Sequence, residues 1–295
     1  MAQLEPYKGT YYLWKYVPSI PAAVIFALLF LLPTLFHIWK ICKTRARFCI
    51  PFAIGGVFEV QGYIIRAIAH NRTSQLIPYI LQNILILLAP VLFAASIYMA
   101  LGRIIRSVPG GAQHALIRPA WQTKVFVMGD IVSFIVQGSA AGMMGKGEKA
   151  GMANNIVIGG LVVQVLLLGG FMVSAVVFEG RVRRAESTGS AGGEDKDGSE
   201  GGEWKRHLRV LYVVSALVLV RSVIRVVEYA MGQEGYLLAN EWCVYVFDGL
   251  LMLVVMVVWG VWHPGSIVNT EGGFVGVDGE GFKMGETSRR GYSAV

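Results

Sequence analysis

The run LRVLYVVSALVLVRSVIRVVEYAM, residues 208–231, decides the fold class because it has the length of a membrane-spanning helix yet carries charges in its second half. About 20 apolar residues suffice for a helix to cross the hydrocarbon core of a bilayer. Arg221, Arg225 and Glu228 lie at positions i, i+4 and i+7, so a helix places them along one face. A charge at the centre of such a helix costs about 2.5–3.5 kcal/mol on insertion scales. We therefore expect this face to turn towards the interior of a helix bundle.

Further segments of the chain have a similar length and apolar composition. Only 15% of the 295 residues are charged and 55% are hydrophobic, whereas a soluble domain carries about 25% charged residues. The sequence therefore predicts an all-α, polytopic membrane protein, a seven-transmembrane-helix bundle. Its predicted spans are residues 17–36, 48–69, 77–101, 125–145, 155–178, 208–231 and 242–262.

The basic residues indicate how this bundle lies in the membrane. Lys and Arg gather in the loops after the first, third and fifth spans and in the C-terminal tail, and they are sparse in the other loops. Cytoplasmic loops are the ones enriched in Lys and Arg. We therefore expect an extracellular N-terminus over residues 1–16, a membrane domain over 17–262 and a cytosolic tail over 263–295.

Two segments have the composition of disordered chain. Residues 185–203, AESTGSAGGEDKDGSEGGE, and the tail 263–295 are rich in Gly and polar side chains and lack apolar periodicity. Such segments cannot bury enough apolar surface to fold. We expect both to be disordered in the cytosol, and an unidentified cytosolic regulator, if the protein has one, would bind there.

Several function classes are excluded by what the chain lacks. The net charge of +7 is spread over short loops rather than one exposed patch, which argues against nucleic-acid binding. The three cysteines form no C-x-x-C pair. All five histidines lie in loops or at the ends of predicted spans, so a metal site is not expected. The sequence contains no Walker A, H-E-x-x-H or G-x-S-x-G motif. We therefore expect no cofactor and no enzymatic activity.

Ionisable side chains within the spans are the main functional candidates, because they are expensive in a membrane. Arg225 lies roughly 9 Å below the outer end of its helix, and Asp248 lies at a similar depth in the next one. A short loop joins these two spans, so we expect an Arg225–Asp248 ion pair. Such charges either fix helix registry or contact a substrate, and the sequence leaves both open. The full set is Glu59, Arg66, Asp130, Arg221, Arg225, Glu228 and Asp248.

Asp130 and three further positions have individual interpretations. Asp130 has no obvious partner, and Gln137 lies about two turns above it, so the carboxylate is a candidate proton acceptor or counter-ion for an amine. Pro90 removes a backbone hydrogen bond from the third span and predicts a kink that frees carbonyls towards a cavity. Asn71 begins the sequon NRT in a predicted outer loop and is a candidate glycosylation site.

Motifs in several spans resemble one known family. They are EVQGYIIR (59–66), LAPVLFAASIYMALGR (88–103), FVMGDIVSFIVQGSAAG (126–142) and RSVIRVVEYAMGQEGYLLANEWCVYVFDGLLM (221–252). In this order the chain resembles the fungal lipid-translocating exporter family of RTA-like seven-helix membrane proteins, linked to aminocholesterol resistance and to the release of sphingoid long-chain bases. The resemblance runs from Tyr16 to Gly265 and implies a protein of the plasma membrane or an internal membrane.

The resemblance implies a protein that moves amphipathic lipids or gives resistance to them. The apolar bundle would take the lipid tail, and Glu59, Asp130, Glu228 and Asp248 would face a cationic head group. Arg66, Arg221 and Arg225 would keep these acids ionised or bind an anionic head group. The alternative is a seven-helix lipid sensor or receptor without transport activity, and an intramembrane hydrolase is a more distant third.

Overall fold

The computed structural model describes residues 6, 14–108, 110–144, 150–187, 200–232 and 235–262, and every regular element within these ranges is helical. The long helices are α1 (Ile20–Thr44), α2 (Ile50–Ala69), α3 (Leu76–Ser107), α5 (Pro119–Met144), α6 (Ala150–Ser187) and α7 (Glu200–Ala230). A last helical stretch is built from α9 (Glu241–Cys243), the π-helix η3 (Val244–Leu250) and α10 (Leu251–Val261). Short elements connect them: η1 (Arg47–Cys49), α4 (Gly111–His114) and α8 (Tyr236–Ala239).

Six of the described helical stretches are long and apolar enough to cross a membrane. They comprise α1, α2 with η1, α3, α6, α7 and the stretch from α9 to α10. An α-helix satisfies all of its backbone hydrogen bonds internally, which is the condition for spanning lipid. The predicted all-α, multi-pass membrane fold is confirmed. The remaining predicted span, the fourth at residues 125–145, corresponds to α5, a helix of 26 residues in the same bundle that is not among these six.

The helices extend beyond the predicted spans. α1 ends at Thr44 rather than at 36, α3 at Ser107 rather than at 101, and α6 at Ser187 rather than at 178. Hydropathy marks the length of chain that suits lipid, whereas a helical backbone can continue into water, so the two limits differ. The loop predicted over 185–203 is correspondingly shorter, because α7 already begins at Glu200. Residues 188–199, residue 145 and the tail 263–295 lie outside the described residues.

The longer α1 also corrects the interpretation of one histidine. His37 lies within the helix and is buried, whereas the sequence placed it at a span end. Its Nε2 lies 3.0 Å from the carbonyl oxygen of Met256 on α10. This side chain therefore joins two helices of the bundle.

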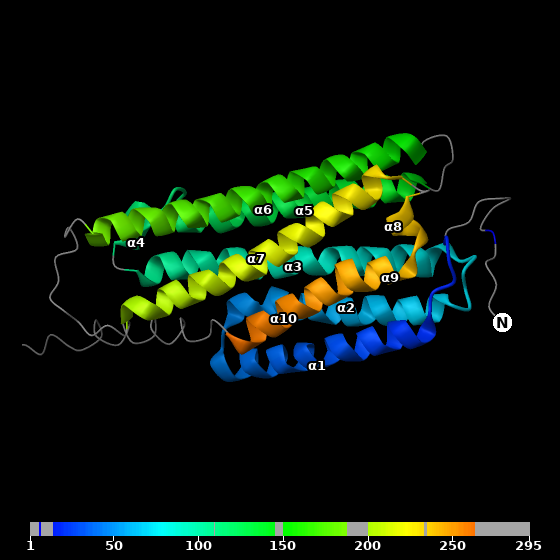
Figure 1. Ribbon diagram of the computed structural model, residues 1–295, viewed down its shortest axis with the longest axis horizontal. Helices are drawn as coiled ribbons and strands as arrows, with labels where there is room; N and C mark the ends of the chain where they lie inside the picture. Colours follow the sequence, from blue (N-terminus) through cyan, green and yellow to red (C-terminus); the bar gives the residue numbers. More distant parts are fainter. Residues whose placement is uncertain are drawn as a thin grey trace, which may run out of the picture.

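The long helices run side by side and alternate in direction (Figure 1). We call the two ends of the bundle the α4 end and the α8 end after the short helices found there (Figure 1). Helix α3 packs against α2, α5, α6 and α7, and 61% of its most apolar stretch is buried, against 28% for α1. α3 is thus the central helix, and the outer helices turn large apolar side chains towards the surroundings.

Close packing brings the π-helix η3 into the centre of the bundle. A side chain at Gly249 would lie 2.6 Å from both the Phe26 ring on α1 and the Tyr63 hydroxyl on α2. Glycine therefore allows η3 to approach these helices. The preceding residue, Asp248, is buried at the same point. π-helical turns occur often at functional sites, and here the turn carries the only carboxylate of the described η3 segment.

Candidate functional site

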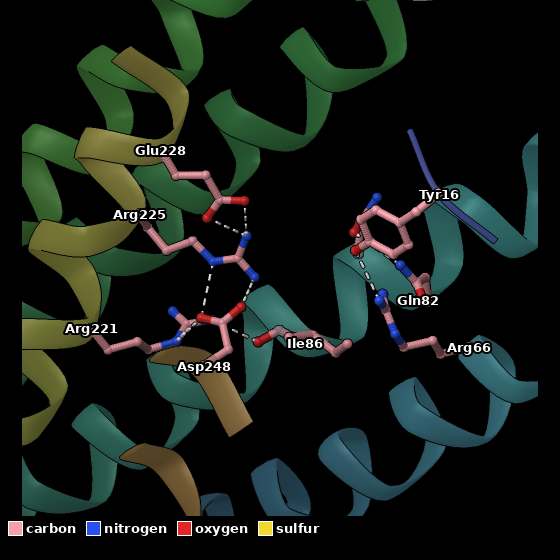
Figure 2. A network of polar contacts seen from close by, with 9 residues as sticks. Tyr16, Arg66, Gln82, Ile86, Arg221, Arg225, Glu228 and Asp248 are labelled. Atoms are coloured by element: carbon pink, nitrogen blue, oxygen red, sulfur yellow. Dashed lines mark hydrogen bonds and ion pairs between the residues drawn. The ribbon is translucent and has the colours of Figure 1, made fainter. Parts of the chain in front are cut away.

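Three buried side chains and one partly buried side chain of α7 and η3 form a connected charge network, which we define as Arg221, Arg225, Asp248 and the partly buried Glu228. Arg225 donates from Nε to Asp248 Oδ1 at 3.0 Å and from Nη2 to Asp248 Oδ2, and its Nη1 donates to Glu228 at 3.0 Å. Arg221 Nε lies 3.1 Å from Asp248 Oδ1. Figure 2 shows the Asp248 carboxylate between the two arginines. The predicted Arg225–Asp248 pair is confirmed, and Arg221 shares its carboxylate.

Pro90 supplies a further partner for Arg221. A proline has no N–H, so the carbonyl four residues earlier in the helix loses its usual donor. That carbonyl belongs to Ile86, and Arg221 Nη2 donates to it at 3.1 Å (Figure 2). The expectation that Pro90 frees a carbonyl is confirmed at this position. α3 continues as one helix through Pro90, and the kink itself stays a prediction.

Glu59 on α2 is buried without a partner. It is 1% exposed, and neither carboxylate oxygen has a hydrogen bond within the described part of the chain. The hydroxyl of Tyr63, one turn further along α2, is likewise buried and unpaired. Arg66, seven residues further along α2, is buried as well. Glu59 and Arg66 do not pair, because Arg66 forms an ion pair with Glu241 instead.

Arg66 lies at the α8 end in a cluster of aromatic rings and one carboxylate. Its Nη2 donates to the Tyr16 hydroxyl at 2.8 Å and to Glu241 Oε1 at 3.1 Å, and its Nε donates to the Tyr245 hydroxyl at 3.1 Å. The guanidinium also lies 5.7 Å from the centre of the Trp14 ring. Burial raises the pKa of Tyr16, which keeps this hydroxyl neutral. Glu241 was missed as a site residue because it lies one position before the predicted seventh span.

Asp130 has a partner that the sequence did not indicate. Asp130 lies on α5 and is buried, and the hydroxyl of Tyr98 on α3 donates to its Oδ2 at 2.9 Å. A carboxylate can accept several further hydrogen bonds. Asp130 therefore keeps acceptor capacity for a second group.

A pocket opens beside Asp130, between α3, α5, α6 and α7. It is small, since only about 20 Å³ admits the centre of a water-sized sphere, and the 440 Å³ of empty space around its lining includes the open surroundings; we call it the Asp130 pocket. Apolar and polar side chains contribute about equally to its wall. At this wall the Nε2 atoms of Gln137 and Gln164 are buried and have no hydrogen-bond partner among the described residues. The pocket unites four of the predicted positions, and sequence reasoning missed Gln164. Its polar lining residues are Tyr98, Asp130, Gln137, Gln164, Arg221 and Ser222.

The remaining predicted positions lie elsewhere. Glu228 and Asp248 line a smaller pocket of about 230 Å³ with Cys243, while Glu59 and Arg66 line neither pocket. Asn71 is exposed at the α8 end, just after α2, and its glycosylation stays a prediction. Within the described ranges, no group of three or more His, Cys, Asp or Glu side chains is arranged to hold a metal ion.

A family model described as "RTA1 like protein" matches residues 52–271. The chain belongs to this family. It is 31% identical over 283 residues to Protein RTA1 of Saccharomyces cerevisiae, a match that covers 87% of this chain and 86% of that protein. It is 35% identical over 222 residues to protoporphyrin uptake protein 1 of the same species, covering 75% and 70% of the two chains.

A third relative of this RTA1-like chain has a lipid in its name. The sphingoid long-chain base transporter RSB1 of S. cerevisiae is 26% identical over 257 residues, covering 78% of this chain and 67% of that protein. No solved structure matches the chain. The family assignment from the sequence motifs is thus confirmed, and the relatives' names differ in their cargo.

Proposed function

We propose that this RTA1-like protein binds single-chain cationic amphiphiles in the Asp130 pocket and moves them across or out of the membrane. The observation that carries the proposal is the pocket itself, where apolar side chains lie beside one carboxylate, the Arg221 guanidinium and two amide nitrogens that have no hydrogen-bond partner among the described residues. An ionised carboxylate and an ammonium group form a strong, charge-assisted hydrogen bond. The name of the relative RSB1, a sphingoid long-chain base transporter, supports this class of cargo.

The polar lining matches an amino-alcohol head group. Asp130 would accept from the ammonium, and the free Nε2 groups of Gln137 and Gln164 would donate to hydroxyl oxygens of the ligand. Unpaired buried donors are costly, at roughly 1–3 kcal/mol each, so a ligand that pairs with them gains affinity. The apolar side chains of the wall would hold the first part of the alkyl chain, and the rest would extend through the open mouth.

The proposed topology has seven spans, with α5 as the fourth, an outside N-terminus and a cytosolic C-terminus. The C-terminal ends of α1, α3 and α6 and the N-terminal ends of α2, α5 and α7 lie at the α4 end (Figure 1). The loops that join these ends are the ones that the sequence enriches in Lys and Arg, which supports a cytosolic α4 end. We further propose that the protein lies in the plasma membrane or an internal membrane. We also propose that it moves its cargo without converting it chemically.

Flux through reconstituted protein tests this function. Proteoliposomes containing the full chain should release a labelled sphingoid long-chain base faster than empty vesicles. Asp130→Asn removes the charge but keeps the shape, and should cost about 1.5–3 kcal/mol of binding, equivalent to roughly ten- to over a hundred-fold in affinity. Glu179→Gln, the same chemical change at an ion pair with Arg183 outside the pocket, is the matched control and should behave as the wild type.

Two results would contradict the proposal. Equal flux in empty and protein-containing vesicles, with several lipids tried, would reject transport. Saturable binding that depends on Asp130 without any flux would instead identify a lipid sensor, the alternative function for the same pocket.

A further inference from the structure

The buried charges near the charge network do not balance. Within the network two arginines face two carboxylates, so these four side chains are neutral together when all are ionised. Glu59 is a further carboxylate, 1% exposed, on which the network acts through space. An ionised Glu59 would leave one negative charge in excess inside the bundle.

The described surroundings of Glu59 offer it no hydrogen bond or direct ion pair. The charged groups that act on it are Arg221 and Arg225 of α7 and Asp248 of η3, while Tyr63 is the titratable neighbour on its own helix. Helices α1 and α3 pack on α2. Within the described residues, neither of them contributes a charged group that acts on Glu59. Both arginines already contact Asp248, and no donor reaches either oxygen of Glu59 in the described part of the chain.

The ionised and the neutral form of a carboxyl group differ greatly in free energy when the group is buried without a partner. Burying an isolated ionised carboxylate costs tens of kcal/mol in the limit of a dry interior, whereas a neutral polar group without a partner costs about 2–7 kcal/mol. The neutral acid is therefore the form of Glu59 that fits this arrangement.

Arg221 links Glu59 to the Asp130 pocket. Its guanidinium lines the pocket and contacts the Ile86 carbonyl and Asp248. The contact from Nε to Asp248 is an ion pair that lacks hydrogen-bond geometry. Arg225, in contrast, makes hydrogen bonds to both Asp248 and Glu228. Arg221 is thus the less firmly held of the two arginines, and it is the cation that a newly ionised Glu59 would attract most.

We propose that Glu59 is a proton-binding site and that it releases its proton when a cationic amphiphile binds in the Asp130 pocket. The proton passes from the carboxylic acid to water, one positive charge leaves as another enters, and the interior gains no net charge. Arg221 then turns from the pocket towards the new carboxylate, which removes a cation that would repel the ligand. The coupling rests on the function proposed above, whereas the protonated state of Glu59 does not.

Infrared absorption of the purified, ligand-free full-length protein tests the protonated state. A carboxylic acid has a carbonyl stretch that a carboxylate lacks, so Glu59→Gln should remove a band that the wild type shows at neutral pH. Asp130→Asn, which alters the other candidate acid, should keep that band. Identical carbonyl regions in the wild type and Glu59→Gln would overturn the proposal. If Glu59→Gln does not fold, Glu59→Asp should shift the band instead, and an unshifted band would overturn it as well.

Binding of a long-chain quaternary ammonium amphiphile tests the coupling, because the charge of this probe does not change with pH. Wild-type affinity should rise with pH by at most about tenfold per unit, the limit for release of one proton. Glu59→Gln should lose this part of the dependence, since it has no proton to release. Equal pH dependence in the two proteins would reject the coupling and leave the transport function standing. Absence of binding to either protein would reject the pocket function and the coupling together, while the infrared band still decides the state of Glu59.

Discussion

The charge network and the Asp130 pocket meet at Arg221, yet they differ in how their polar groups are satisfied. In the network, Arg225 has two carboxylate partners, and Asp248 is shared by two arginines. In the pocket, the described residues give Asp130 a single hydroxyl donor and leave the amide nitrogens of Gln137 and Gln164 without a partner. In an apolar bundle, polar groups that satisfy one another hold helices together. Groups left unsatisfied beside an open space mark where a ligand fits.

The largest expected effect comes from breaking the network. Arg225→Ala and Asp248→Ala should each lower the free energy of unfolding by about 3–5 kcal/mol, because each leaves a buried charge without its partner. Thermal unfolding in detergent measures this. The control is Arg183→Ala, which removes an arginine that is 64% exposed and pairs with Glu179, and which should cost under about 1 kcal/mol.

A double-mutant cycle sharpens this result, and the loss in the double variant should be smaller than the sum of the two single losses. Exchanging the two residues, Arg225→Asp with Asp248→Arg, should recover little, since the new aspartate faces Glu228 and the new arginine faces Arg221. Additive losses in the cycle would show that the two residues act independently, against the ion pair seen in the structure.

A smaller effect is expected from two adjacent glycines of α6. A side chain at Gly160 would lie 2.7 Å from Cγ of Gln137, whereas one at Gly159 would meet nothing within 4 Å. Gly160→Ala should therefore cost about 1–3 kcal/mol by overpacking and weaken amphiphile binding, because the Gln137 amide must move. Gly159→Ala should be neutral or stabilising by up to about 1 kcal/mol. Melting temperature and ligand affinity measured on both variants compare them, and equal affinities would remove Gln137 from the site.

The smallest effect is expected from Pro90→Ala. The new N–H can bond the Ile86 carbonyl within α3 and so competes with Arg221 for this acceptor. The free energy of unfolding should change by only about 0.5–1.5 kcal/mol, the net contribution of one hydrogen bond. Amphiphile affinity should change more clearly, since Arg221 lines the pocket. An unaltered affinity and pH dependence would show that the Ile86 contact does not position Arg221.

The sequence could predict an ion pair between two helices that a short loop connects. Arg225 and Asp248 lie at matching distances from the loop that joins their helices, so helical rise alone brings them to the same depth. Tyr98 and Asp130 belong to neighbouring helices as well, but several turns of helix separate them from the connection. Which faces of α3 and α5 meet there depends on the rotation of both helices, and apolar composition leaves that rotation open.

The sequence by itself determined the helices, the family and the one-faced stripe of charges on α7, because a backbone in lipid must bond internally and its charges must turn inwards. Only the tertiary structure decided which charge has a partner. It assigned Arg66 to Glu241, gave Asp248 to two arginines, left Glu59 with none and gathered Asp130, Gln137 and Gln164 around one pocket. The physical reason is that the partner of a side chain on another helix depends on how the helices pack against each other. Many residues that are far apart in the chain determine that packing jointly.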